Sequence, residues 1–594
     1  MTIQLQSTPN INGVLLRCSR ALAELIGTNF VYALLMAKKG FNIRKLLKIV
    51  FITFVSLILL VILTGWYLNR HWNKLLQREL PGYVAELSDS LYTVKFNNLH
   101  LDVLSGSLTV EKVVMTADTT IYQRLLGQQR APAEVYTISV DKLELKYFKP
   151  WRYFIGKELN AASLTVTGPS VIMEQNATVR DTTTPRTAYQ NISAKMKSIF
   201  IGKLVLDSTN FKYIFTRKDS SRVVHQFHNL RVRINDFLID SLALDDPTRF
   251  LYARNYEIGM RDYMNKTRDS LYWINVRGIR YDAALRTLHI GRFEVQPRYD
   301  KDAFQKKTGV QQDRYEMVLN DISLHELNPR LLLQEQQIWA QRVNIKGGSV
   351  EIYRNRMLPM PPGNKLGQYP HQLLHQLKLP LSIDTLNCNN INIQYKELSP
   401  VTTQTGYINF SHLHGLVRNI TNIDSLVAKN RQMTANFDAV FMQSGKLTAK
   451  FDFTLNDKAG HFGVSGQLKN MNGKDLNVVT KPLGKIEIRS CDIQELSFNI
   501  KGDERKAAGH VNMLYQNLKI AVLKQDKDHK EYKRKGLISL LANSLVINES
   551  NPLRGEKART ATVSYQRDIQ KSYFNLVWKT LFTGVKDIAG AGNL

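Results

Sequence analysis

One stretch of sequence occurs twice, and this repetition constrains the possible fold more than any other feature of the chain. Residues 136–174 align without a gap to residues 315–353. The alignment keeps tyrosine, proline and glycine in place, so chance similarity between unrelated strands is a poor explanation. The identical pairs are Tyr136/Tyr315, Leu145/Leu324, Pro150/Pro329, Ala161/Ala340, Gly168/Gly347, Ser170/Ser349 and Val171/Val350. We therefore expect two tandem copies of one structural unit.

Apolar and polar residues alternate within the repeat and on both sides of it. Clear examples are residues 107–117, 164–173 and 445–455. Alternation with a period of two predicts β-strands that bury one face. The phase of the alternation slips after Val140 and, equivalently, after Leu319. The shared slip predicts a bulge or turn in both copies, and the chain as a whole is predicted to be mainly β.

These patterns divide the chain into segments. We expect the first strands of the body at 69–135, two β-units at 136–314 and 315–480, strands with a charged loop at 481–570, and a helix at 571–594. Each unit is expected to contain a strand, a short helix after a proline, a strand, a turn and a strand. Short helices are expected at 150–156, 328–337 and 370–377. Antiparallel strands that never close would leave an apolar groove, whereas a closed barrel would fill it, and the alternation allows both.

Residues 49–68 carry no charged side chain. As a helix rising 1.5 Å per residue, such a segment spans the roughly 30 Å hydrocarbon core of a membrane. Basic residues are denser before it (Lys38, Lys39, Arg44, Lys45 and Lys48) than after it (Arg70, Lys74 and Arg78). This asymmetry predicts that residues 1–48 are cytoplasmic and that the body lies across the membrane. Met36 begins the sequence Met-Ala-Lys-Lys-Gly, which is typical of the start of a signal anchor, and is expected to be the initiator.

The end of the chain has the spacing of an amphipathic helix. Apolar residues recur there every three or four positions, with lysines and polar residues between them: Phe574, Val577, Trp578, Leu581, Phe582 and Val585. This pattern is typical of a helix in a membrane interface. A helix that plugs the end of a β-sheet has the same pattern, so both interpretations stay open.

The sequence offers little for catalysis. It has no GxSxG nucleophile elbow, no GxxxxGK(S/T) phosphate loop and no dinucleotide fingerprint. His371 and His375 have the spacing of a zinc-binding helix, but Gln372 occupies the position of the general base and an amide cannot accept the proton. No metal site, cofactor or catalytic residue is therefore predicted. Cys388 and Cys491 are interpreted as two separate core thiols.

The chain has 80 Lys and Arg residues against 51 Asp and Glu, a formal net charge of +29. Such an excess can indicate nucleic acid, an anionic membrane or only solubility. The basic residues are spread along predicted strands instead of gathering in a nucleic-acid-binding motif. Because the body is also expected across a membrane from nucleic acid, no nucleic-acid partner is predicted.

Together, four features resemble the AsmA-like family, the relatives of TamB, in the form found in Bacteroidetes. The features are the basic-flanked anchor, the strands at 90–115, the proline-containing unit ending in IGKELNAASLTVTGPSVIM, and the C-terminal SYFNLVWKTLFTGVKD. The resemblance covers roughly residues 45–587. It implies an elongated, open, twisted antiparallel β-groove with short interspersed helices. It also implies an inner-membrane anchor, a periplasmic body, and phospholipid movement toward the outer membrane or maintenance of that membrane.

The resemblance directs attention to alternate apolar residues as lipid-groove candidates. These are Leu143, Leu145, Leu164, Val166 and Leu204 in the first unit, and Ile322, Leu324, Val343, Ile345 and Leu386 in the second. The expected partners are the inner membrane, phospholipid, and outer-membrane or other envelope proteins. Two alternatives stay open: a non-enzymatic scaffold that assembles outer-membrane proteins without lipid cargo, and an envelope hydrolase that uses the histidine pairs.

Overall fold

The computed structural model describes residues 82–591, except 83, 86–87, 89, 103–105, 150–151, 153–155, 180–186, 194–195, 526–531 and 534–546. The predicted cytoplasmic segment 1–48, with Met36, and the predicted membrane span 49–68 lie outside the described residues. Within the described part, no helix is both long and apolar enough to cross a membrane.

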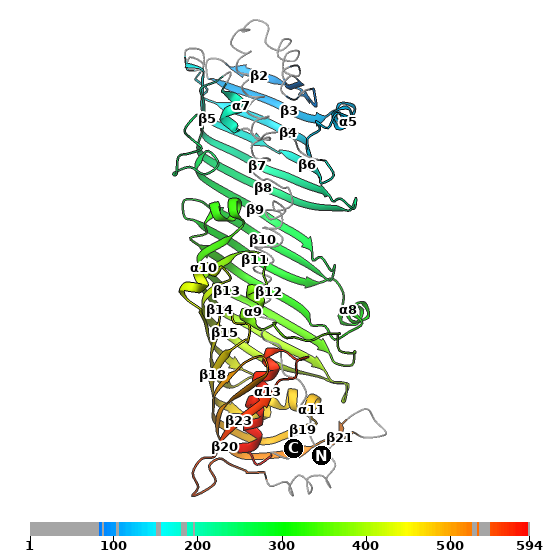
Figure 1. The fold of residues 1–594 in the computed structure, drawn as a ribbon, viewed down its shortest axis with the longest axis vertical. Helices are drawn as coiled ribbons and strands as arrows, with labels where there is room; N and C mark the ends of the chain where they lie inside the picture. The colour runs from blue at the N-terminus through cyan, green and yellow to red at the C-terminus, as the bar shows by residue number, and fades with distance from the viewer. Residues whose placement is uncertain are drawn as a thin grey trace.

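The described chain forms one long, twisted sheet of 21 strands, stacked along the long axis of the molecule (Figure 1). The strands are β1 (Tyr92–Lys95), β2 (Leu99–Asp102), β3 (Ser107–Ala117), β4 (Glu134–Lys146), β5 (Glu158–Thr167), β6 (Ser170–Asn176), β7 (Ser198–Thr216), β8 (Arg222–Ile239), β9 (Ala253–Lys266), β10 (Tyr272–Asp282), β11 (Thr287–Pro297), β12 (Arg314–His325), β13 (Ile338–Asn355), β14 (Leu381–Leu398), β15 (Thr405–Thr421), β16 (Gln432–Phe441), β17 (Gly445–Thr454), β18 (Phe462–Asn472), β19 (Ile486–Gly502), β20 (Lys506–Val522) and β23 (Thr560–Gln566). Two further strands, β21 (Lys524–Gln525) and β22 (Tyr532–Lys533), pair with each other.

Short helices connect the strands, as the sequence predicts. They are α5 (Thr119–Gly127), α7 (Ala188–Ile192), α8 (Lys301–Thr308), the π-helix η3 (Leu331–Glu335), α9 (Pro370–His375), α10 (Asp424–Lys429), the 3-10 helix η4 (Gly473–Leu476), α11 (Asn477–Gly484) and the longer α13 (Tyr573–Ile588). Helices α5 and α8 lie beside the same edge of the sheet, and α13 lies across the last strands (Figure 1). Helix α9 confirms the predicted short helix after Pro370, and α13 confirms the predicted C-terminal helix.

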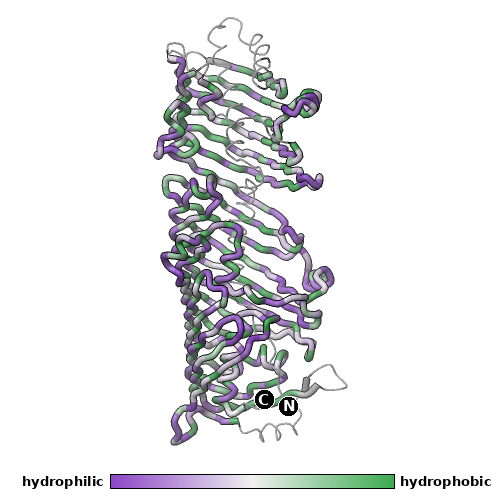
Figure 2. Tube along the Cα trace, in the orientation of Figure 1, coloured by the Kyte–Doolittle hydropathy of each residue, from purple (hydrophilic) through white to green (hydrophobic). Residues whose placement is uncertain are grey.

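The alternation located strands well. The predicted strand 107–117 is β3, and 445–455 is β17. The predicted strand 164–173 is shared between β5 and β6, which run in one direction and one register along both β4 and β7. The predicted turn is therefore wrong: Gly168 only interrupts the strand with a left-handed backbone, φ 61°, and β13 runs through the equivalent Gly347 without a break. A Cβ at Gly168 would collide with the Asp141 side chain, so no other residue fits without displacing it. Figure 2 shows the alternation of hydrophilic and hydrophobic residues along the strands.

The prediction of a purely antiparallel sheet is wrong at two places. Strands β5 and β6 both pair in parallel with β7, and β13 pairs in parallel with β14. Parallel neighbours begin at the same edge of the sheet, so the chain must return across it between them. Between β13 and β14 the connection 356–380 makes this return. Both copies of the repeat have the same order of pairings, whereas the unit boundaries stay a prediction because the sheet is continuous across them.

The predicted phase slip is present, but it is not an inserted residue. In β12 burial passes from Leu319 to Ile322, and in β4 from Val140 to Leu143. The pairing of β12 with β13 nevertheless continues one to one through the slip. Asp321 has a left-handed backbone with a φ of 50° at this point. This local rotation of the backbone therefore shifts the alternation of apolar and polar residues by one position, without an inserted residue.

Candidate functional site

One ladder of cross-strand neighbours is apolar across nearly the whole sheet. Directly paired residues lie on the same face, so their side chains form a continuous row perpendicular to the strands. We call this ladder the apolar row. From β3 to β23 it consists of Val110, Leu143, Val166, Leu206, Val232, Ile258, Tyr281, Leu288, Leu324, Val343, Leu386, Val417, Ala435, Phe451, Val464, Ile500, Gly509 and Val563. No charged residue interrupts it.

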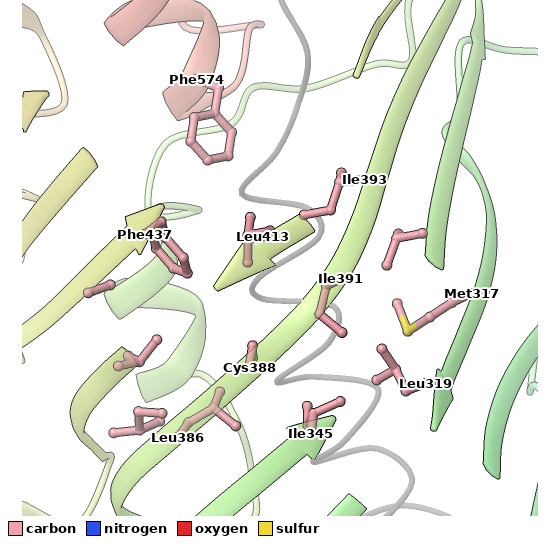
Figure 3. Packing of buried hydrophobic residues seen from close by; sticks show 14 of the residues in the cluster. Met317, Leu319, Ile345, Leu386, Cys388, Ile391, Ile393, Leu413, Phe437 and Phe574 are labelled. Atoms are coloured by element: carbon pink, nitrogen blue, oxygen red, sulfur yellow. The ribbon is translucent and has the colours of Figure 1, made fainter. Parts of the chain in front are cut away.

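The predicted groove residues all lie on this face. Leu143, Val166, Leu324, Val343 and Leu386 belong to the apolar row itself. The other five pair in the two neighbouring ladders, Leu145 with Leu164 and Leu204 in the first unit, and Ile322 with Ile345 in the second. All ten are buried. Figure 3 shows Ile345, Leu386 and Leu413 on adjoining strands, with Phe437 on the next strand.

The apolar row is most accessible in the middle of the molecule. Leu206, Val232 and Ile258, on β7, β8 and β9, are only partly buried. They lie where the two hydrophobic clusters of the protein meet, one extending back to Val84 and the other forward to Ile588. Phe451 and Gly509 are the other partly buried members of the row, and the remaining members are buried.

A crossover strap, residues 356–380, packs on the apolar face beside the row, against Phe453 and Phe462 near its C-terminal end. It leaves β13 and returns to β14, and its Tyr369 packs edge-on against Phe462 of β18 at 5.8 Å. Tyr369 also donates a hydrogen bond to the Asp503 carbonyl at 2.9 Å. The guanidinium of Arg567 lies 4.5 Å from the Tyr369 ring and donates to the Lys365 carbonyl at 2.7 Å. The strap therefore joins distant parts of the sheet across its apolar face.

Helix α13 packs on the last strands of the sheet. Its buried stripe is Tyr573, Leu576, Val577, Thr580, Gly584 and Ile588. A Cβ on Gly584 would lie 2.6 Å from Val511 of β20, which shows how closely the helix approaches the sheet. Of the predicted interface residues, Phe574 and Val577 are buried, whereas Trp578, Leu581, Phe582 and Val585 are partly buried. The helix packs on the last strands through this stripe, and Leu581 and Val585 are partly buried against the same hydrophobic cluster.

The histidine pair lies on the strap. His371 is 0 % exposed, and neither of its ring nitrogens has a hydrogen-bond partner in the described part of the chain. Burial lowers the pKa of His371 to about 4, against a partly opposing effect of Asp457. No group of three His, Cys, Asp or Glu residues among those described is placed to hold a metal ion. Cys388 and Cys491 are free and buried, and burial raises the pKa of each thiol to about 12.

Two buried polar clusters were missed by the sequence reasoning. In the first unit, the Tyr136 hydroxyl donates to Glu134 at 2.8 Å, and Tyr213 donates to Gln175 at 2.5 Å. Gln175 in turn donates to Glu134 at 3.5 Å. The Tyr136 backbone N–H donates to the Tyr92 hydroxyl at 3.2 Å. The cluster joins β1, β4, β6 and β7 at one edge of the sheet.

The second unit has the equivalent cluster with charged residues. The Tyr315 hydroxyl donates to Asp313 at 2.8 Å, and Arg354 binds both oxygens of Asp313 at 2.6 and 2.7 Å. Arg356 contacts the fully buried Glu397 at 2.9 Å. A signal for these residues existed, because Glu134 and Asp313 both lie two residues before the aligned repeat, and Gln175 and Arg354 directly follow it.

Comparison with known proteins does not identify a family for this chain. No protein-family model matches the chain, and no curated protein matches it. The resemblance to the AsmA-like family therefore stays a prediction, and the geometry of the apolar face is the basis for the functional argument.

Proposed function

We propose that this chain is a non-enzymatic carrier of phospholipid, anchored in the inner membrane by residues 49–68 with its body in the periplasm. In this role it moves lipid toward the outer membrane or supports the integrity of that membrane. The observation that carries the proposal is the apolar row, which no charged residue interrupts from Val110 to Val563. At about 4.8 Å per strand, the row is on the order of 80 Å long.

The proposed mechanism is passive. Acyl chains lie against the apolar row while the headgroups stay in water, so hydrocarbon avoids the aqueous phase during movement. Each CH₂ group kept from water contributes about 0.8 kcal/mol. Because neighbouring positions of the row are chemically alike, a chain moves between them with little change in free energy. A concentration gradient or a partner protein then sets the direction.

The test uses the accessible middle of the row. Val232→Glu places a charge on the apolar face of β8, and Asn235→Glu places the same charge on an exposed position of the same strand. We expect detergent-extracted full-length protein to retain phospholipid by native mass spectrometry. Val232→Glu should lower the bound lipid severalfold, since a carboxylate next to acyl chains costs several kcal/mol, whereas Asn235→Glu should leave it unchanged.

The outcomes also address the alternatives. Wild-type protein without any bound lipid would contradict lipid transport and favour the scaffold. Equal lipid retention by both variants would show that lipid lies elsewhere than on the row. For the hydrolase alternative, loss of envelope function in a His371→Ala, His375→Ala double mutant that folds normally and still retains lipid would count against a purely passive carrier.

A further inference from the structure

The middle of the crossover strap (residues 356–380) is held by loops far along the sheet from the two strands that the strap joins. Strands β13 and β14 are direct neighbours, but the Lys365 amide of the strap donates to the Ile569 carbonyl, which follows β23, at 2.7 Å. Tyr369 donates to the Asp503 carbonyl, which follows β19, at 2.9 Å. The strap itself contains no strand. It therefore lies on the sheet without belonging to it.

One buried arginine fastens the strap at these loops. The guanidinium of Arg567 donates to the Lys365 carbonyl at 2.7 Å and lies 4.5 Å from the Tyr369 ring centroid. The same guanidinium lies 3.6 Å from the carboxylate of Glu504, which accepts a hydrogen bond from the Gly367 amide of the strap. The two loops that follow β19 and β23 thus hold the strap through one ion pair and its immediate hydrogen bonds.

The strap covers the ladder of residues next to the apolar row. Phe453 and Phe462 are direct cross-strand partners on β17 and β18, and Phe453 lies on the same face as Phe451 of the row, about 7 Å along the strand. The ring centroid of His371 lies 5.3 Å from that of Phe453, and the centroid of Tyr369 lies 5.8 Å from that of Phe462. Strap side chains therefore occupy apolar surface on which hydrocarbon would otherwise lie.

The contact between the strap and the sheet buries polar atoms at a cost in free energy. Five buried atoms there have no hydrogen-bond partner among the described residues: Nδ1 and Nε2 of His371, Nε2 of His375, Nε of Arg567 and the hydroxyl of Tyr573. The Tyr573 ring lies 5.0 Å from the Tyr369 ring, so α13 takes part in the same contact. A buried polar atom without a partner costs free energy that is regained when water reaches it. This cost partly offsets the apolar packing and favours an interface that opens.

We infer that the strap is a displaceable lid on the apolar face, and that a phospholipid passes β17 and β18 only when the strap is displaced. A phospholipid carries two acyl chains, so it needs the Phe453–Phe462 ladder in addition to the apolar row. Hydrocarbon then replaces the rings of Tyr369 and His371 on this ladder, while the polar atoms of the opened strap reach water. This inference rests on the proposed lipid transport and adds a gate to it.

The first experiment locks the strap with a disulfide. Lys365→Cys and Ile569→Cys join two backbones that already share a hydrogen bond, and Cys18→Ser leaves only the buried Cys388 and Cys491 as other thiols. Full-length protein is placed in donor vesicles, and transfer of fluorescent phosphatidylethanolamine to acceptor vesicles is followed. We expect transfer to be lost when the pair is oxidised and to return when the pair is reduced.

A matched control places a disulfide under the strap on the opposite face of the sheet. Lys446 and Lys469 are exposed cross-strand partners on β17 and β18. The variant with Lys446→Cys and Lys469→Cys should transfer lipid equally well in both redox states. Equal transfer by the oxidised and reduced strap variant, or an equal loss in the oxidised control, would overturn the inference. A wild type that transfers no lipid would instead contradict lipid transport itself, and the lid with it.

A second measurement follows the strap without any cross-link. Hydrogen exchange is recorded on wild-type protein with and without phosphatidylethanolamine vesicles. The amides of Lys365 and Gly367, which donate to Ile569 and Glu504 in the closed strap, should exchange faster with lipid, whereas β14 (Leu381–Leu398) should be unaffected. Strap amides that keep their protection while lipid is being transferred would show that lipid passes a closed strap, and would overturn the inference while leaving lipid transport intact.

Discussion

His371 is a fully buried imidazole that packs on an aromatic ring. Its ring centroid lies 5.3 Å from that of Phe453, and Asp457, His375 and His461 are the charged or titratable groups that act on it. Because burial excludes the charged form, the folded pKa of about 4 lies below the ordinary value near 6.5. The unfolded chain therefore binds the proton more tightly, and the folded state loses stability as the pH falls from about 6.5 to about 4.

This reasoning predicts the effect of replacing the imidazole. On lowering the pH from 7 to 4, the free energy of unfolding of wild type should fall by about 3 kcal/mol more than that of His371→Leu. Urea unfolding at several pH values measures the difference. His100→Leu, at an exposed position, serves as the control and should follow the wild type. A His371→Leu protein with the full wild-type pH dependence would refute the assignment.

At the scale of the element, α13 shows what sequence periodicity can and cannot specify. The three- and four-residue spacing predicted a helix, and the helix is there from Tyr573 to Ile588. The spacing could not select the packed stripe, because apolar residues occupy two adjoining stripes. Gly584 and Thr580 mark the packed stripe, since small side chains permit close approach to β20 and β23. That role becomes visible only when the opposing Val511 is known.

Gly584→Ala should loosen α13. The added methyl would lie 2.6 Å from a Val511 methyl and 3.2 Å from Val563, so the helix or the valines must move. We expect a loss of about 1–3 kcal/mol in the free energy of unfolding, together with faster hydrogen exchange in residues 573–588.

Gly127→Ala is the matched control, because a Cβ at the end of α5 has nothing within 4 Å. It should be neutral or slightly stabilising, since alanine favours helix more than glycine does. Unchanged exchange in α13 of Gly584→Ala would mean that the helix does not pack as described.

The positions of strands could be predicted from the sequence, whereas the relative directions of neighbouring strands could not. Local alternation located β3 and β17 closely, because each strand carries its own two-residue period. The parallel pairs β5–β7 and β13–β14 could not be read from it, because parallel and antiparallel neighbours place the same residues on the buried face. The buried Asp313–Arg354 pair was also hidden, since a charged residue at a strand end looks like ordinary surface in the sequence.

At the scale of the whole molecule, the apolar row runs along nearly the whole sheet. A lipid that travels along the row must therefore pass each of its positions in turn. Val232→Glu and Phe451→Glu place charges on β8 and β17, far apart along the row. If lipid travels along the row, either charge alone should reduce transfer between donor and acceptor vesicles strongly, and the double variant should be little worse than the more damaging single one. Separate binding sites would instead give multiplying losses. Asn235→Glu with Lys446→Glu is the matched double control on exposed positions.

The orientation of the strands also has a mechanical consequence. The strands lie across the long axis, so the hydrogen bonds between them point along it (Figure 1). A pull between the two ends would load one pair of strands at a time and peel the pairs apart, instead of shearing many bonds together. The sheet should therefore yield at low force and in small steps, with β11–β12, β15–β16 and β20–β23 among the first to part because they share short ladders.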